Sequence, residues 1–287
     1  MNRDLISIIP VAGLGIRMMP TTKVIPKELL PIPVEYKGRM VLIPLLHLIL
    51  LKLYQAGIRD YVIVLSRNKE IIKNYLTIDY SFIEFLRKSE NKEFEAHIFE
   101  NFYKVLSNIN ITFKYQDIPR GFGDAIYQAK EYIRNDFIIH PGDDFIIDDE
   151  RDKNYIEKLI AIKKKFNSDL VFYVEEVVDP RHYGVIIGRE IERNIYRVDN
   201  LIEKPTTPTS NLAITAIYVM TKDLLDEMNY LRNMGVEWEL IDAINRLLKK
   251  GYTAYAIKIN ESCRIDVGRP IEYIKSIEKA LERKIRI

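Results

Sequence analysis

The sequence is poor in the residues that build disulfide frameworks and metal clusters. It has one cysteine, Cys263, among 287 residues, which excludes an intramolecular disulfide and a Cys-rich zinc site. Its 43 lysines and arginines nearly balance 41 acidic residues, and no basic cluster forms the stripe that a nucleic-acid-binding protein needs. No apolar run approaches the roughly 18 residues that span a bilayer, and the N-terminal apolar segment is too short for a signal peptide. We therefore expect a cytoplasmic protein that acts on small molecules, without nucleic-acid or membrane partners.

Apolar runs of strand length alternate with helical patterns along most of the chain. Runs Leu5–Ala12 and Tyr61–Leu65 flank the helical run Leu42–Gln55, after which Gly57 provides a left-handed helix stop. Such a strand–helix–strand unit predicts two parallel strands with a right-handed crossover. The other expected elements are a helical excursion over residues 69–106, strands at 111–115, 137–140, 170–174, 185–188, 196–201, 213–220 and 252–257, and helices at 124–133, 156–166, 222–233, 240–250 and 271–283. We expect an α/β fold in one domain, residues 1–287, with a doubly wound, mostly parallel mixed sheet and helices on both faces.

The segment after the first strand is the first candidate site, because ligands of such sheets bind at the carboxyl ends of the strands. Ala12 ends the strand, and Gly13 and Gly15 follow it. Glycines let backbone N–H groups approach an anion, and the guanidinium of Arg17 can grip phosphate oxygens. Met18 stands where a dinucleotide-binding fingerprint has its third glycine, and no P-loop Gly-Lys-Ser/Thr follows. By itself, the pattern is equally consistent with a tight turn.

The charge of this region points to an anionic ligand. Residues 1–40 contain six lysines and arginines against three acidic residues, a net charge of +3. Lys27 lies between Pro26 and Pro31, which restrict the loop that carries it. This combination indicates a site for a triphosphate, and the simpler alternative is a solvated surface lysine.

The run VAGLGIRMMPTTKVIPKELLPI, residues 11–32, resembles the N-terminal signature G-x-G-T-R…P-K-x-L-[LV]-P of the sugar-nucleotide pyrophosphorylases. Further motifs of that family follow in matching order, so the resemblance covers about residues 5–283. Segments Pro20–Glu28 and Ser210–Ile214 are closest to the bacterial uridylyltransferases that join UTP and glucose 1-phosphate, with the dTTP-using thymidylyltransferases next. The resemblance implies nucleotidyl transfer from a nucleoside triphosphate to a sugar 1-phosphate, a Rossmann-like fold of GT-A type, Mg²⁺ as cofactor, and a homodimer or homotetramer.

The resemblance also divides the chain into a nucleotide-binding part, residues 1–145, and a part that mainly binds sugar phosphate and adds the C-terminal helices, residues 146–287. The implied nucleotide contacts are Ala12, Gly13, Gly15, Gln116 and Gly121. Arg17, Lys27 and Asp143 are the implied catalytic residues, and Asp143 and Asp266 are the implied Mg²⁺ ligands. Without the family context, Gln116 would be a solvated strand-end residue, and Asp266 would cap the turn before Pro270.

The implied sugar-phosphate contacts are Gly184, Glu203, Lys204, Asn211 and Glu237. Lys204 would hold the sugar phosphate, and Glu203 would accept hydrogen bonds from sugar hydroxyls. Glu237 is equally well explained as a carboxylate that the positive end of a helix dipole favours.

Two departures from the family pattern bear on affinity and base choice. Ile16 replaces the threonine of G-x-G-T-R, and residues 35–39 form a longer polar insertion than the usual Asp-Lys-Pro. The motifs leave UTP and dTTP undecided. A non-catalytic sugar-nucleotide-binding subunit would lack the metal carboxylate or phosphate lysines, whereas Asp143, Lys27 and Lys204 are all present. A nicotinamide-dependent dehydrogenase would require the third glycine that Met18 replaces.

Overall fold

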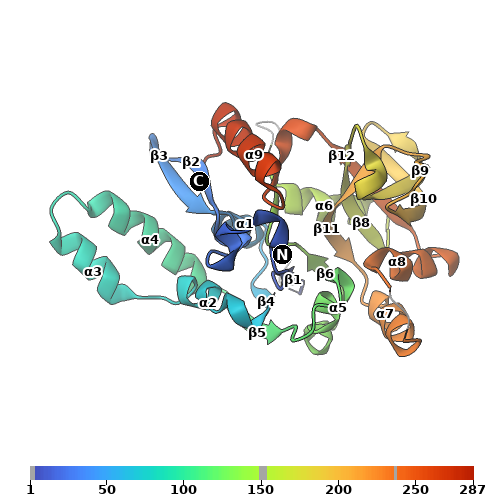
Figure 1. The fold of residues 1–287 in the computed structure, drawn as a ribbon, viewed down its shortest axis with the longest axis horizontal. Helices are drawn as coiled ribbons and strands as arrows, with labels where there is room; N and C mark the ends of the chain where they lie inside the picture. The colour runs from blue at the N-terminus through green and yellow to red at the C-terminus, as the bar shows by residue number, and fades with distance from the viewer. Residues whose placement is uncertain (1–3, 149–153, 236–237) are drawn as a thin grey trace.

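A nine-stranded mixed sheet runs through the molecule in the computed structural model, which describes residues 4–148, 154–235 and 238–287 (Figure 1). In spatial order its strands are β5 (Asn110–Tyr115), β4 (Asp60–Leu65), β1 (Ile6–Pro10), β6 (Phe137–Ile139), β11 (Leu212–Met220), β8 (Leu170–Glu176), β12 (Ala254–Ile259), β10 (Ile195–Glu203) and β9 (Gly184–Glu192). Strands β5, β4, β1 and β6 are mutually parallel, and β12 is parallel to β8. Strands β11 and β10 run in the opposite direction to the other strands of this sheet, because each pairs antiparallel with both of its neighbours in this order. The expectation of a mixed sheet is therefore confirmed, but only half of the neighbouring pairs in this order are parallel.

Helices cover both faces of the sheet, because alternate residues of its buried strands face opposite sides. Ile9 and Ile63 belong to one apolar cluster, together with residues of α1 (Leu45–Gln55), α4 (Glu93–Leu106) and α6 (Tyr155–Lys165). Ile8 and Val62 belong to the other, with residues of α5 (Phe122–Tyr127), α7 (Leu224–Asn233) and α8 (Leu240–Lys249). Two short helices, α2 (Ile71–Tyr75) and α3 (Tyr80–Lys88), precede α4, and the pair α3–α4 extends from one end of the molecule (Figure 1).

In the described part of the chain, four strands lie outside the large sheet, and sequence reasoning missed all of them. A hairpin of β2 (Pro31–Tyr36) and β3 (Arg39–Pro44) turns at Lys37 and Gly38, both with positive φ. The polar insertion at residues 35–39 is thus a hairpin tip. The predicted helix Leu42–Gln55 begins only at Leu45, because its first residues pair in β3.

The second pair, β7 (Asp144–Ile146) with β13 (Arg264–Asp266), joins segments 120 residues apart and sets Asp266 opposite Asp144. The last helix, α9 (Pro270–Arg283), begins at the predicted proline. The helix predicted over residues 124–133 is wrong in its extent, because α5 ends at Tyr127 and a 3₁₀ turn follows at Lys130–Tyr132.

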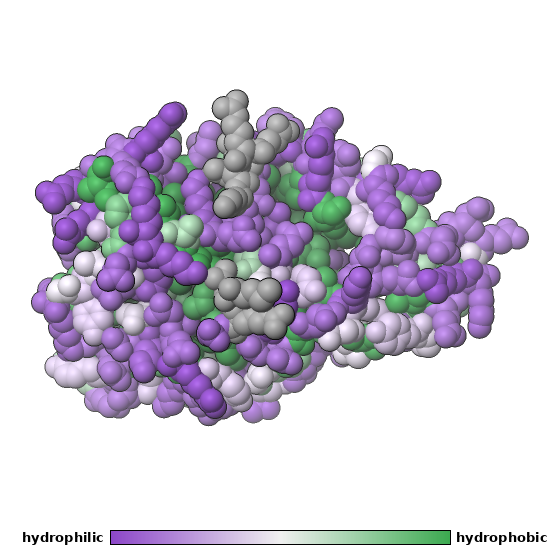
Figure 2. Space-filling model, turned by 180° about the vertical axis from the view of Figure 1, so that it is seen from behind, coloured by the Kyte–Doolittle hydropathy of each residue, from purple (hydrophilic) through white to green (hydrophobic). Residues whose placement is uncertain are grey.

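Polar side chains dominate the face of the molecule seen in Figure 2, with apolar side chains in small separate areas. Within the three described ranges, no helix is both long and apolar enough to cross a membrane.

A buried histidine joins three helices of one layer. His47 of α1 is 2.8 Å from the hydroxyl of Tyr75 in α2, through Nδ1, and stacks on Phe102 of α4 with ring centroids 3.5 Å apart. Burial lowers the pKa of His47 to about 3, so the folded protein holds this ring neutral through mildly acidic pH.

The neutral ring makes stability depend on pH in a calculable way. An unfolded histidine protonates near pH 6.5, so His47 contributes stability above that pH and loses it as pH falls toward 3. Between pH 7.5 and 5.0, the unfolding free energy of the wild type should fall by about 2 kcal/mol more than that of His47→Gln. Urea titrations at both pH values measure this difference. His182→Gln, with its side chain 60% exposed, is the control and should keep the wild-type pH dependence; the same dependence in His47→Gln would contradict the account.

Candidate active site

The turn after β1 has a conformation that requires glycine. Gly15 has φ +66°, and a Cβ at that position would lie 3.0 Å from Cβ of Thr22. The hydroxyl of Thr22 donates a 2.7 Å hydrogen bond to the carbonyl of Gly15. The turn is therefore held in shape by its own downstream segment, and Arg17 extends beyond it as an exposed side chain.

A cavity of about 430 Å³ opens at the carboxyl edge of the sheet, between this turn, the segment after β5 and the segment after β6. All eight residues that the sequence assigned to nucleotide binding or catalysis line it: Ala12, Gly13, Gly15, Arg17, Lys27, Gln116, Gly121 and Asp143. They come from three chain segments that parallel strands bring to one edge. The structure therefore brings these eight residues together at one cavity, and their roles in binding and catalysis stay predictions.

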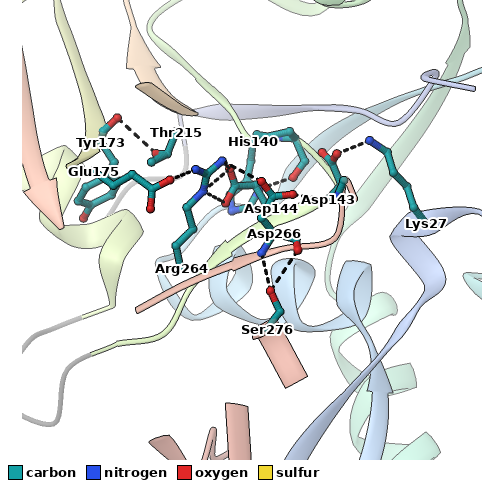
Figure 3. Close-up of polar contacts among 12 residues, drawn as sticks. Lys27, His140, Asp143, Asp144, Tyr173, Glu175, Thr215, Arg264, Asp266 and Ser276 are labelled. Carbon is teal, nitrogen blue, oxygen red and sulfur yellow. Dashed lines mark hydrogen bonds and ion pairs between the residues drawn. The ribbon is translucent and has the colours of Figure 1, made fainter. Parts of the chain in front are cut away.

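Lys27 and Asp143 form an ion pair at this cavity (Figure 3). Burial opposes the charged form of Lys27, but the carboxylates of Asp143 and Glu28 outweigh it and raise the lysine pKa. Burial likewise acts to raise the pKa of Asp143, and the charge of Lys27 overcomes it, so that this pKa is lowered. Both groups are therefore charged at neutral pH.

A second, fully buried ion pair lies behind the first, and sequence reasoning missed it. Nζ of Lys69 is 2.8 Å from both carboxylate oxygens of Glu28, and the two residues are 4% and 1% exposed. Burial raises the pKa of Glu28 and lowers that of Lys69. A Cβ on Gly142 would lie 2.9 Å from Cγ of Glu28, so the pair also supports the segment before Asp143. The only feature of the sequence that could have indicated this pair is Glu28, a charged residue beside Lys27 in a hydrophobic segment.

The amide of Gln116 is fixed by contacts within the protein. Its Nε2 donates to the carbonyl of Gly121 at 3.1 Å and to the carboxylate of Asp124 at 2.9 Å. Both amide hydrogens are used in these bonds, so Oε1 is the atom that can meet a ligand. Gly121 has φ +95°, which a side chain would strain.

Arg264 organises the carboxylates on the other side of Asp143 (Figure 3). Its guanidinium binds Asp144 through Nε at 3.0 Å and Nη2 at 2.8 Å, contacts Glu175, and lies 3.4 Å from Asp266. Burial raises the pKa of Asp144 to about 7 against the charge of Arg264. Ser276 of α9 completes the arrangement, since its hydroxyl accepts from the backbone N–H of Asp266 at 2.9 Å.

The pairing of β7 with β13 places Asp143 and Asp266 on one hollow of about 240 Å³ beside the main cavity. Mg²⁺ typically takes one or two carboxylates and completes its shell with phosphate oxygens and water. These two aspartates fit that donor set. Among the described residues, no three or more histidine, cysteine or acidic side chains form a group that could hold a metal by themselves, so bound phosphates would have to supply the remaining ligands.

The predicted sugar-phosphate residues are only partly brought together. Gly184 pairs with Glu203 across β9 and β10, and a Cβ on Gly184 would lie 3.1 Å from that carboxylate. Lys204 lies 2.7 Å from Glu203, and its side chain is 58% exposed. Its hydrogen bond to Glu203 raises the pKa of Lys204, while the charge of Arg17 acts to lower it. Lys204 and the nucleotide cavity are therefore within electrostatic range of each other.

Asn211, another predicted sugar contact, is not part of this arrangement. The Asn211 amide donates to Glu176 at 2.8 Å and lines a separate hollow with Lys258, beyond the ends of β8 and β12. The sequence motif around Asn211 could not predict that the side chain would contact Glu176 at the end of β8. Glu237 lies outside the described residues.

The family model described as nucleotidyl transferase matches residues 6–283, and the chain belongs to this family. A UTP–glucose-1-phosphate uridylyltransferase of Staphylococcus epidermidis is 33% identical over 283 residues, covering 96% of this chain and 92% of the relative. The crystal structure of an apo UDP-glucose pyrophosphorylase matches with a TM-score of 0.83 at 24% identity, over 98% of this chain and 99% of the other. A UTP-bound enzyme from Acinetobacter baumannii matches with a TM-score of 0.81 at 24% identity, over 97% and 94% of the chains.

The Arg264 cluster predicts a large effect on stability. Arg264→Met removes the only cation that bridges two buried carboxylates, Asp144 and Glu175, within the described part of the chain. Removing one partner from such a cluster costs about 3–5 kcal/mol, which urea unfolding at pH 8 would measure. Arg181→Met breaks the exposed pair with Asp179 and should leave the unfolding free energy close to that of the wild type. Equal stability of the two variants would refute the assignment.

Proposed function

We propose that the protein transfers the uridylyl group of UTP to glucose 1-phosphate, forming UDP-glucose and pyrophosphate. The observation that carries this proposal is the convergence of the Gly13–Gly15 turn, Arg17, Lys27 and Asp143 on one cavity. The names of the relatives support the choice of UTP and glucose 1-phosphate. The retained cations and carboxylates favour an enzyme over a non-catalytic sugar-nucleotide-binding subunit.

The chemistry needs alignment and charge more than proton transfer. A sugar phosphate already presents an oxyanion, so no general base is required, and the barrier lies in bringing two anions together in line. Arg17 and Lys27 bind the triphosphate and stabilise the negative charge that builds up on the departing pyrophosphate. Asp143 and Asp266 would hold Mg²⁺, which would neutralise phosphate charge when bound. Lys27 must then exchange its bond to Asp143 for one to phosphate.

The fixed amide of Gln116 supports recognition of a uracil-type base. With both N–H groups donated inside the protein, its oxygen can only accept a hydrogen bond. Uracil and thymine offer an N3–H where cytosine has an acceptor nitrogen, so cytidine triphosphate is disfavoured. The amide does not separate UTP from dTTP; the relatives favour UTP over the thymidylyltransferase alternative.

The proposed binding site for the acceptor, the sugar 1-phosphate, is formed by Gly184, Glu203 and Lys204. Asn211 and Glu237 are further proposed contacts. Lys204 would release Glu203 and bind the sugar phosphate, and Glu203 would then accept from sugar hydroxyls. We propose the doubly wound GT-A description for the single domain, with residues 1–145 mainly binding nucleotide and residues 146–287 mainly binding sugar phosphate. A cytoplasmic homodimer or homotetramer completes the proposal.

A substrate panel tests the function directly. Pyrophosphate release is measured with UTP, dTTP, CTP and ATP, each against glucose 1-phosphate and several other sugar phosphates, in the presence of Mg²⁺. We expect the highest kcat/KM for UTP with glucose 1-phosphate, weaker turnover with dTTP, and little with CTP or ATP. Turnover with dTTP but none with UTP would indicate that the protein is a thymidylyltransferase instead. Absence of pyrophosphate release with every pair would point to the non-catalytic subunit.

A further inference from the structure

The hollow of about 240 Å³ that contains Asp143 and Asp266 continues away from the nucleotide cavity. Arg17 and Gly268 line both spaces, so the two are contiguous. On its far side the hollow is lined by His182, Tyr183, Arg264, Arg269 and Glu272. Residues of the first turn of α9 therefore face the space beside the proposed metal ligands.

Arg269 is an unused cation in this hollow. It immediately precedes Pro270 at the start of α9, and its side chain does not cap the helix. Whereas Arg264 contacts three carboxylates, the guanidinium of Arg269 makes no hydrogen bond or ion pair with any described residue. Burial raises the pKa of Tyr183, and the charges of Arg264 and Arg269 act to lower it, which places Arg269 near the tyrosine.

Glu272 is the second unsatisfied group, one turn further along α9. Its Oε2 is buried and has no hydrogen-bond partner among the described residues. Buried carboxylate oxygens are costly without a donor, so a donor from outside the chain belongs there. Arg269 and Glu272 thus border one hollow with opposite charges, and neither is neutralised by the other.

The hollow adjoins the sugar side of the site. Tyr183 precedes Gly184, where β9 begins, and its carbonyl accepts a 3.0 Å hydrogen bond from the backbone N–H of Lys204. Arg17, on the turn after β1, borders the hollow as well. An acceptor phosphate bound in this hollow would therefore lie against a lining that contains both Arg269 and Asp143.

We infer that the first turn of α9 forms part of the acceptor site, in which Arg269 binds the phosphate of the sugar 1-phosphate and Glu272 accepts a hydrogen bond from a sugar hydroxyl. A guanidinium matches two phosphate oxygens at once. A carboxylate repels phosphate, so Glu272 faces the hydroxyl side. This inference rests on the proposed function and adds two acceptor-binding residues to Lys204.

Steady-state kinetics on Arg269→Ala and Arg269→Lys test the phosphate contact. A lost charge-assisted bond should raise the KM for glucose 1-phosphate about ten- to a hundredfold in Arg269→Ala, with partial recovery in Arg269→Lys. The dissociation constant of UTP, from calorimetry, should stay close to that of the wild type. Thermal unfolding should match the wild type, because the side chain makes no hydrogen bond or ion pair with any described residue. Lys275→Ala, an exposed change on the same helix, is the matched control with wild-type kinetics.

Inorganic phosphate separates the two residues. Inorganic phosphate should compete with glucose 1-phosphate, and its inhibition constant should rise in Arg269→Ala. In Glu272→Gln the inhibition constant should stay at the wild-type value, whereas the KM for glucose 1-phosphate should rise. The inference would be wrong if Arg269→Ala left the KM for glucose 1-phosphate unchanged, or if it raised the KM for UTP equally. In that case the turnover of the wild type would still support the proposed function. If the wild type turns over no pair in the substrate panel, the function fails, and the inference falls with it.

Discussion

The ion pair between Lys27 and Asp143 is the contact on which the site depends. It ties the loop after β1 to the segment after β6 and places a cation and a carboxylate in the lining of one cavity. The buried Glu28–Lys69 pair lies behind it, and the Arg264 cluster lies beside it. Lys27, Asp143, Glu28 and Lys69 are thus each paired within the fold, so a phosphate that binds Lys27 must displace Asp143 from it.

This balance explains why so much charge is buried at one edge of the sheet. Ion pairs taken out of water gain little net stability, because desolvation offsets their attraction. Their value here is geometric. Glu28 packs against Gly142, and Arg264 aligns Asp144, Glu175 and Asp266, so that the carboxylates stand in fixed positions before any substrate arrives. Such preorganisation is what charge-stabilised phosphoryl transfer demands.

The sequence predicted the parts of this structure that local patterns encode. The parallel strands, the start of α9 at Pro270 and the gathering of Gly15, Lys27 and Gln116 follow from periodicity, proline and glycine chemistry, and the family motif. The pairing of β7 with β13 could not be predicted, because it joins short strands far apart in the chain. The partners of Lys69 and Arg264 depend on that long-range packing. The direction of Asn211 depends on where β8 and β12 end.

The partner exchange at Lys27 can be measured by calorimetry of UTP binding with and without Mg²⁺, in the wild type and in Asp143→Asn. In the wild type, metal-free UTP must compete with Asp143 for Lys27, and Mg²⁺ should tighten binding strongly. In Asp143→Asn the lysine is released, so metal-free UTP should bind about tenfold more tightly than to the wild type, and Mg²⁺ should add little. Weaker metal-free binding in Asp143→Asn, with the full effect of Mg²⁺ retained, would contradict the account.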